Sequence, residues 1–553
     1  MRLILINLFR NLFRAAKIAA LALFLGFAAA APATQANATQ TQLAALSSRI
    51  ALEISAQSPL GSIDAPALQA FYGARAFAPI WITDKAGSAL AQSTLMAAGN
   101  EGLNPEDYHA SAIAKLAGGT TLDQVGRELL LTDGLLKYAY DLRLGHLAPN
   151  EVDGDIELPA QSFQAAGELS KALAGGTLGQ FLADLPPPHP EYAALRDALK
   201  RYRKIAEDGG WAQFTFAPKD KSAAAKTALW ARLRAEDASL GAQNAKDNNA
   251  LSQALARFQA RNGLAVDGKL SERTIDALNV PALQRISQIE ANMERWRWLP
   301  RTFEADYVAV NVPDASLIAV HGGKTVLTSR VVVGRPNDPT PILRATITAV
   351  TANPPWDVPM SIARKEYLPK LRKDSAFLAE HHIFIKERPG DPSGATIAWP
   401  KVAARDFNYH LRQAPGPDNA LGRVKLEMPN KYSVYLHDTP NTAVFANNDR
   451  DLSHGCMRVD RIVELASVAL SGDPAAETDT VKALIDAGET KTVPLIKPIP
   501  IYALYWTAFV NGAGETQFRR DLYGRDGRLI ALLKGQPGEQ RLAESQGCPV
   551  HAG

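Results

Sequence analysis

Residues Tyr432–Asp460 have the sequence YSVYLHDTPNTAVFANNDRDLSHGCMRVD, which contains two histidines and one of only two cysteines in the 553-residue chain. The β-branched and aromatic residues of 432–436 predict a strand that ends at His437. The polar residues that follow predict a loop. Cys456 is expected in a tight turn before a helix, for which Asp460 is the candidate N-cap. The apolar residues that predict this helix by their spacing are Ile462, Val463, Ala466 and Leu470.

The residues around Cys456 are those of a cysteine acyl-transfer site. A thiolate is the nucleophile, whereas a free thiol with a pKa of ~8.5 is mostly protonated at neutral pH. His437 and His454 are the two candidate bases for that proton. Gly455 permits close backbone approach and unusual dihedral angles. The amides of Gly455 and Cys456 are therefore candidates for an oxyanion hole.

Two other interpretations fit the same residues. A small buried cysteine beside two structural histidines would give this spacing without any chemistry. A zinc site would use Cys456, His454 and His437, but these supply only three ligands and no C-x-x-C pair accompanies them. We therefore expect no metal at this place.

Several short motifs lie within residues 415–458: Pro415-Gly416-Pro417, Asn419-Ala420-Leu421-Gly422, Met428-Pro429-Asn430, His437-Asp438 and Ser453-His454-Gly455-Cys456-Met457-Arg458. Together they resemble the signature of the L,D-transpeptidases, the peptidoglycan enzymes with a YkuD-type catalytic domain. The resemblance is to the large multidomain periplasmic branch, which Arg458 follows, whereas many smaller relatives have Asn there. Asp438 departs from some small relatives, which have Ser or Gly.

The resemblance implies a reaction and a role for each residue. Cys456 would attack the carbonyl of the third stem residue, diaminopimelate, and release the terminal D-alanine, and an acceptor amine would then resolve the acyl-enzyme. His437 would be the base, while His454 and Gly455 would shape the oxyanion site. Peptidoglycan stem peptides are the expected partner, and no cofactor is expected. Substrate contacts are expected at Arg458, Ser453, Tyr435 and Asn419.

The acceptor stays open, because the first half-reaction uses the same residues whatever follows. Water as acceptor would make an L,D-carboxypeptidase, and an amine of a lipoprotein would make a lipoprotein-anchoring transpeptidase. A non-catalytic peptidoglycan-binding scaffold is a different class, but it would not need a cysteine and a base. A papain-like protease is disfavoured, because Cys456 follows its histidine and the papain cysteine motif is absent.

The first 38 residues are typical of a secretory signal peptide. Four basic residues and no acid are combined with the apolar run 18–30 and with small-residue cleavage sites at 31–33 and 36–38. We expect export to the periplasm, with an uncleaved signal anchor as the alternative, and no later stretch is apolar enough to span a membrane. Removal would change the formal charge from +3 to −1, which argues against a nucleic-acid surface.

Export would place Cys456 in an oxidising compartment. Its only possible disulfide partner is Cys548, in the polar tail 536–553, which we expect to be disordered. Pairing would occupy the nucleophile, so the functional interpretation requires Cys456 to stay reduced.

The fold class expected from these patterns is a multidomain α+β protein. Residues 39–245 have helical spacing and predict a mainly helical scaffold domain. Its segment 71–81, FYGARAFAPIW, resembles a motif of the same large transpeptidases, and its aromatic rings are expected in the core. Residues 246–300 predict short helices and a connecting helix, and 255–268 resembles small peptidoglycan-binding modules. A helical packing unit without glycan affinity is the alternative.

Residues 301–535 predict a β-rich catalytic domain. A charged, partly helical segment at 361–412, without an obvious core stripe, interrupts the β pattern, and we interpret it as an inserted lid. A turn is expected at 321–323. Alternation with a period of two, or β-rich composition, predicts strands at 307–312, 316–320, 325–333, 496–505 and 507–510.

Overall fold

The computed structural model describes residues 40–55, 63–237, 239–241 and 247–535. The chain divides into two compact units, one of 1–143 with 163–186 and the other of 144–162 with 187–553. The expected signal peptide 1–38, the expected tail 536–553 and Cys548 lie outside the described residues. In the part of the chain that is described, no helix is both long and apolar enough to cross a membrane.

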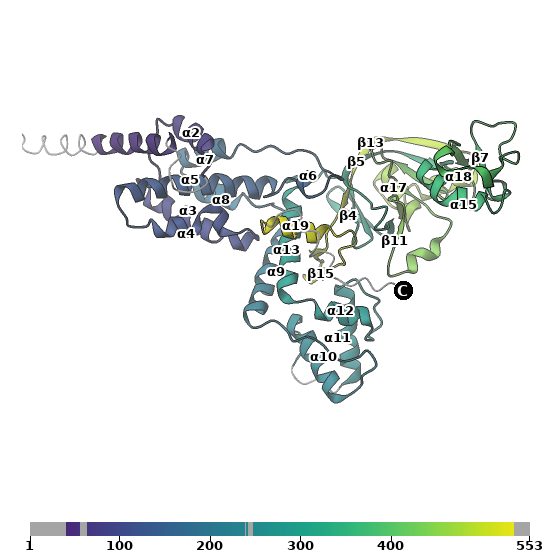
Figure 1. The fold of residues 1–553 in the computed structure, drawn as a ribbon, viewed down its shortest axis with the longest axis horizontal. Coiled ribbons are helices and arrows are strands. Elements are labelled where there is room, and N and C mark those ends of the chain that lie inside the picture. The colour runs from purple at the N-terminus through teal and green to yellow at the C-terminus, as the bar shows by residue number, and fades with distance from the viewer. Residues whose placement is uncertain (1–39, 56–62, 238, 242–246, 536–553) are drawn as a thin grey trace, which may run out of the picture. The chain divides into compact units, whose positions relative to one another are not determined.

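The first unit is helical, as predicted (Figure 1). Phe71, Tyr72 and Trp81 are at most 3 % exposed, so the prediction that these rings form core is confirmed. Glu128 is buried beside them and accepts hydrogen bonds from the Ile80 amide and the Tyr72 hydroxyl, which satisfies its carboxylate. The α-helices are 40–55, α2 (Ala65–Gly73), α3 (Lys85–Met96), α4 (Ala110–Lys115), α5 (Thr121–Leu144), α7 (Ala165–Ala174) and α8 (Leu178–Ala183).

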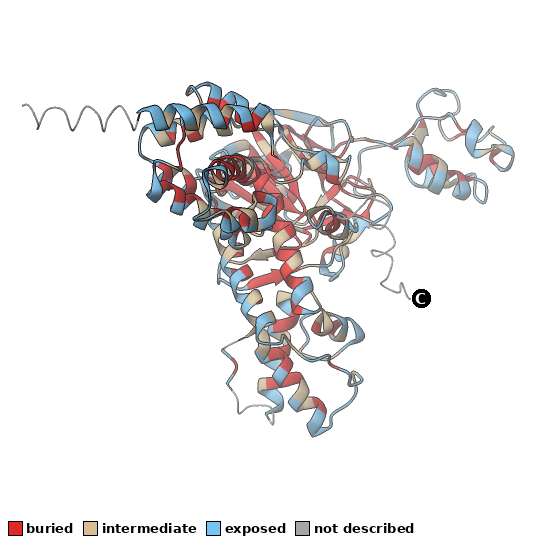
Figure 2. Cartoon of the chain, turned by 60° about the vertical axis from the view of Figure 1, so that its left-hand side comes forward, coloured by how far each residue is buried: buried red, intermediate tan, exposed pale blue. Residues whose placement is uncertain are grey.

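The second unit includes a small helical module. Helices α10 (Ala223–Glu236), α11 (Asn248–Arg261) and α12 (Glu272–Asn279) enclose Phe258, which is fully buried. Figure 2 shows buried residues on the inner sides of these helices and exposed ones outside. The turn at Gly263 has a φ of 62°, a value that glycine adopts without strain. Two helices around this turn confirm the prediction for this region.

Helix α13 (Ala282–Arg297) follows the module and packs against α9 (Pro190–Glu207). Asn292 on α13 is buried, and both polar atoms of its side chain form hydrogen bonds. Its amide nitrogen donates to the Thr507 hydroxyl at 2.8 Å, and its oxygen accepts from the Thr507 amide at 3.0 Å. These bonds join α13 directly to the β domain that follows.

The β domain is built on a sheet that closes on itself. The strand order is β5, β13, β2, β3, β4, β12, β10, β9, and β9 pairs again with β5, so these strands leave no free edge. The strands predicted from 307 to 333 and from 496 to 510 are confirmed. Their bounds are β2 (Tyr307–Asn311), β3 (Ser316–His321), β4 (Lys324–Gly334), β5 (Ile342–Ala352), β9 (Val424–Glu427), β10 (Leu436–His437), β12 (Met457–Val459), β13 (Lys491–Leu504) and β14 (Ala508–Val510).

Shorter elements complete the domain. Helix α17 (Ile462–Ser471) contacts β3, β4, β5, β9 and β13 and fills the core with Leu465 and Ala466, which are at most 1 % exposed. The remaining elements are β1 (Ile156–Glu157), beside β5, β11 (Asp451–Ser453), beside β4, β15 (Thr516–Phe518), α6 (Pro149–Val152), α18 (Thr478–Asp486) and α19 (Arg525–Leu533). With the helical module and the first unit, this arrangement confirms the α+β class.

The expected strand at 432–436 is wrong, since only β10 (Leu436–His437) forms. The cause is Asn430, whose side-chain oxygen accepts from the Tyr432 amide at 3.1 Å and whose amide donates to the Val434 carbonyl at 2.7 Å. These bonds hold the backbone in a turn with a positive φ at Ser433.

The expected N-cap at Asp460 is also wrong. Its carboxylate binds the guanidinium of Arg330 at 2.7 Å, and Arg461 occupies the N-cap position of α17 without a side-chain cap. Cys456 does lie in a tight turn, but this turn joins β11 to β12, and the helix begins only after β12.

The inserted segment, which in the structure extends from residue 356 to residue 413, has a hydrophobic core of its own, although its sequence shows no obvious core stripe. Trp399 and Phe407 are fully buried in it. Its helices are too short to show a stripe in sequence, and its apolar residues converge only in the fold. Its elements are β6 (Trp356–Asp357), β7 (Ile383–Ile385) and β8 (Leu411–Gln413) in one small sheet, with α14 (Met360–Ile362), the π-helix η3 (Ala363–Tyr367), α15 (Leu368–Leu371) and α16 (Phe377–Glu380).

Candidate active site

Strand pairing places four of the expected site residues on one face of the sheet. In the parallel pair β10 and β12, Leu436 lies opposite Met457 and His437 opposite Arg458. Leu436 and Met457 are fully buried in the core. Because side chains alternate across a strand, their neighbours face the other way. Those neighbours are Tyr435, His437, Cys456 and Arg458, and all four line a cavity of about 420 Å³.

The turn that carries Cys456 is fixed by Ser453. The Ser453 hydroxyl donates to the Cys456 carbonyl at 2.6 Å and accepts from the Gly455 amide at 3.1 Å. Gly455 has a φ of 105°, which side chains strongly disfavour, and its carbonyl accepts from the Thr340 hydroxyl at 2.9 Å. Since the Gly455 amide is already used, the Cys456 amide is the remaining candidate for an oxyanion hole.

The Cys456 thiol forms no disulfide within the described part of the chain and is half-buried, and its sulfur lies 4.0 Å from the carbonyl oxygen of Ser433. Burial raises the pKa of the thiol, although Tyr435 and the charges of Lys425 and Arg458 act in the opposite direction. The resting group is therefore a neutral thiol near pH 7.

His437 is 4 % exposed. Burial, with a smaller contribution from the charge of Arg458, lowers the pKa of His437 to about 3. Its Nδ1 has no hydrogen-bond partner among the described residues, and its ring stands edge-on to Tyr435 at 5.6 Å between centroids. His437 is thus a neutral imidazole with an unused nitrogen, diagonal to Cys456 on the same face.

Asp438, beside this histidine, has a separate task. Its carboxylate accepts from the Arg423 amide at 2.8 Å and lies against Gly422, so it fixes the start of β9. The backbone of Asp438, together with that of Leu421, also forms a hydrogen bond with the His437 ring, so Asp438 holds this ring through its backbone and not through its carboxylate.

His454 is turned towards the inserted segment. Its Nε2 contacts the carboxylate of Glu366 in η3, which also accepts from Arg335 at 3.1 Å. Burial alone would raise the pKa of Glu366, but the contacts with His454 and Arg335 lower it. His454 therefore joins the Cys456 turn to the insert.

Arg458 stands on the cavity wall with no acidic partner among the described residues. Its Nε is buried without a hydrogen bond, and burial lowers the pKa of its guanidinium. Such a cation suits a carboxylate brought by a ligand. Asn419 is different: it is 1 % exposed, does not line the cavity, and bonds the Ala414 carbonyl and the Leu421 amide.

Sequence reasoning missed the cavity wall supplied by the insert. Trp356, Glu366, Tyr367 and Lys370 line it, opposite the Cys456 turn. They lie about 90 residues from the motif in sequence, and nothing local marks them. The only sequence signal for this wall was the charged character of the segment, from which we predicted an inserted lid. Among the described residues, no cluster of three His, Cys, Asp or Glu side chains could hold a metal ion.

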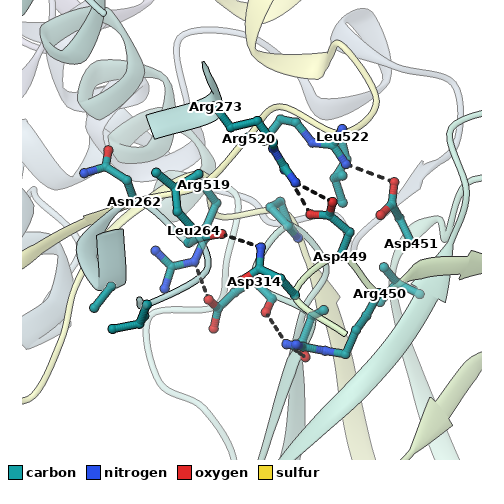
Figure 3. Close-up of a pocket in the computed structure, with 17 residues that line it drawn as sticks. Asn262, Leu264, Arg273, Asp314, Asp449, Arg450, Asp451, Arg519, Arg520 and Leu522 are labelled. Atoms are coloured by element: carbon teal, nitrogen blue, oxygen red, sulfur yellow. Dashed lines mark hydrogen bonds and ion pairs between the residues drawn. The ribbon is translucent and has the colours of Figure 1, made fainter. Parts of the chain in front are cut away.

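A second cavity, of about 310 Å³, lies between the helical module and the β domain (Figure 3). Three of its four arginines pair with its acids, and Arg450 donates to the backbone carbonyls of Asp314 and Ala315, so we interpret it as a polar junction. Asp449 and Asp451 belong to the segment that leads into Ser453, and the junction therefore helps to fix the Cys456 turn. The ion pairs are Arg273 with Asp449 at 2.6 Å, Arg520 with Asp451 at 3.0 Å, and Arg519 with Asp314.

Comparison with known proteins gives three family matches. Residues 305–476 match the model described as "L,D-transpeptidase catalytic domain", residues 224–278 match "Putative peptidoglycan binding domain", and residues 66–199 match "Scaffold domain". A curated protein of Haemophilus influenzae named "Putative L,D-transpeptidase" is 33 % identical over 275 residues. The match covers 48 % of this chain and 54 % of that protein, about half of its length.

One solved structure, described as "Structure of the Ldtfm-avibactam carbamoyl enzyme", also matches. It is 11 % identical, covers 47 % of this chain and 81 % of its own, and gives a TM-score of 0.19. That score is too low for its arrangement to bear on the site.

Proposed function

We propose that this chain is a peptidoglycan L,D-transpeptidase with Cys456 as the nucleophile. The matches to an L,D-transpeptidase catalytic domain, a peptidoglycan-binding domain and a scaffold domain support this proposal. The observation that carries the proposal is the pairing of a free thiol with a buried, neutral imidazole on one cavity wall. Export to the periplasm, expected from residues 1–38, belongs to the same proposal.

In the first half-reaction the Cys456 sulfur attacks the carbonyl of the third stem residue, and the thiol proton passes to His437. The Cys456 amide faces the developing oxyanion. The bond to the terminal D-alanine breaks, and its amine takes the proton back from the imidazole. A thioester and free D-alanine result, with atoms and charge in balance.

In the second half-reaction an acceptor amine attacks the thioester, loses a proton to His437 and displaces the sulfur, which regains a proton. The stem carboxylate is held by Arg458, and Tyr435 packs beside the reacting atoms. Ser453, Gly455 and His454 set the shape of the turn. Asn419 acts only through the backbone that it bonds, which supports a positioning role and no substrate contact.

The test is mass spectrometry of muropeptides after incubation of residues 39–553 with tetrapeptide-stem fragments. Crosslinked dimers with released D-alanine are the expected products. Tripeptides alone would favour the L,D-carboxypeptidase, and transfer only to a lipoprotein lysine would favour the anchoring enzyme.

Cys456→Ala should abolish every product and keep the fold, while Cys548→Ser should change neither, because only one of the two thiols has a chemical task. Turnover by Cys456→Ala would refute the proposal. Binding without any product from the unmodified chain would favour a non-catalytic scaffold.

A further inference from the structure

A groove in the helical module, separate from the Cys456 cavity, has the form of a ligand site. It lies between α10 and α11 and the loop at 268–270, with a volume of about 780 Å³. Its floor is apolar, since Leu229, Leu251 and Leu255 are at most 9 % exposed. Among the described residues that line it, none is aromatic.

One wall of the groove is rigidly held by Gln259 on α11. This side chain is 1 % exposed. Its oxygen accepts from the amides of Asp267 and Gly268 at 3.1 and 2.8 Å, and its amide donates to the Lys269 carbonyl at 2.8 Å. At Gly268 a Cβ would lie 2.8 Å from the Ser252 carbonyl oxygen, so only glycine lets the loop approach α11 this closely. The loop that presents Lys269 is therefore preorganised.

The rim of the groove carries an excess of positive charge. Four lysines line it, against one acid, Asp220, whose carboxylate accepts from the Ser222 amide at 2.8 Å. None of the four lysines lies within ion-pair distance of an acid in the described part of the chain, although the charge of Lys269 acts on the nearby Asp267 carboxylate and helps to lower the pKa of that carboxylate. The four are Lys219, Lys221, Lys226 and Lys269.

We propose that this groove binds the acidic stem peptide of peptidoglycan, an inference that rests on the proposed function for the identity of the polymer. Stem peptides carry free carboxylates, which complement the lysine rim, and alkyl chains, which match the leucine floor. The glycan strand fits less well, because the groove offers no aromatic face for a sugar to stack on. The module would thus hold stems near the enzyme without consuming them.

The test uses the whole chain with Cys456→Ala, so that bound stems are not turned over. Retention is measured on insoluble peptidoglycan with intact stems and on the same material after an amidase has removed them. Lys226→Gln with Lys269→Gln removes two rim charges. Lys115→Gln with Lys200→Gln, on exposed positions of α4 and α9, is the control with the same change in charge.

The rim variant should bind intact peptidoglycan about fivefold more weakly, as expected for two exposed charge pairs, and with a shallower salt dependence. Its binding to stem-free glycan should equal that of the control. Equal retention of both variants on intact material would overturn the proposal, and an equal loss on stem-free glycan would assign the groove to sugar.

Turnover of soluble fragments tests the proposed function separately from binding in the groove. With Cys456 restored, the rim variant should turn over soluble tetrapeptide fragments as the unmodified chain does, because the Cys456 cavity is untouched. If the unmodified chain makes no product, the proposed function fails, whatever the groove binds. A rim variant that loses turnover of soluble fragments would contradict a separate stem site.

Discussion

Replacing Glu366 by Gln should loosen the inserted segment from the Cys456 turn. The Glu366 carboxylate is the contact of this segment with His454, and it also accepts from Arg335 at 3.1 Å. Gln keeps the shape and can accept one hydrogen bond, but it removes the negative charge that both partners face. The insert should then open more often over the cavity that it helps to line.

The free energy lost with the Glu366 contact can be judged from how far its side chains are exposed to solvent. The side chains of Glu366, His454 and Arg335 are 35, 29 and 41 % exposed, so solvent screens the contact in part. Exposed ion pairs contribute about 0.2–1 kcal/mol, and hydrogen bonds to charged groups about 1.5–3 kcal/mol. We take about 1 kcal/mol, which corresponds to about a fivefold increase in the open population.

The assay is the ratio of hydrolysed tripeptide to crosslinked product from tetrapeptide stems. Water competes with the acceptor amine for the thioester, and a closed cover excludes water, so Glu366→Gln should raise this ratio about fivefold. Glu387→Gln is the matched control, because Glu387 forms the same kind of pair with His410 entirely within the insert. An unchanged ratio in Glu366→Gln, or the same rise in both variants, would refute the reasoning.

Three further predictions concern the two histidines and the module. His437→Ala should lower kcat/KM for acyl transfer by about 10²–10⁴, the usual value of a general base, and His454→Ala by only about fivefold; the opposite order would reverse the assignment of the base. Because burial lowers the pKa of His437 to about 3 from an ordinary value of 6.5, the unfolded chain binds a proton first as pH falls. Stability from this group is thus complete above pH 6.5 and is lost on acidification towards pH 3. His437→Gln should reduce the slope of the unfolding free energy in that window, as measured by denaturant titration, and an unchanged slope would contradict a buried neutral imidazole. Gln259→Ala should destabilise the module by about 2–4 kcal/mol, because it leaves buried amides without acceptors, whereas the exposed Gln253→Ala on the same helix should be neutral in thermal unfolding.

Sequence alone predicted the parts of the fold whose signal is local. The period of two at 307–333 identified β2, β3 and β4, and the helical spacing after Cys456 identified α17. The prediction failed at 432–436, where β propensity is high but the side chain of Asn430 holds the backbone in a turn. A single polar side chain outweighs the propensity of its neighbours there, which a composition argument does not capture.

The insert shows a second limit of sequence reasoning. Charge and irregular spacing suggested a cover and showed no core stripe, yet Trp399 and Phe407 are buried with residues from both ends of the segment. A core assembled from short elements has no period to detect. A cover with its own core can move as one body, so loss of a single contact such as that of Glu366 can change its position without unfolding it.

The two histidines of the motif show why residue type did not fix their roles. Both stand within 20 residues of Cys456, and either could serve as base by chemistry alone. The deciding feature of His454 is a carboxylate from Glu366, 88 residues away, which occupies its ring nitrogen. The deciding feature of His437 is the lack of any partner for Nδ1 in the described structure, together with burial that keeps the ring neutral. A general base needs an unprotonated nitrogen whose lone pair is available at the moment of attack. Nδ1 of His437 meets this requirement, whereas Nε2 of His454 would first have to break its contact with Glu366 of the insert.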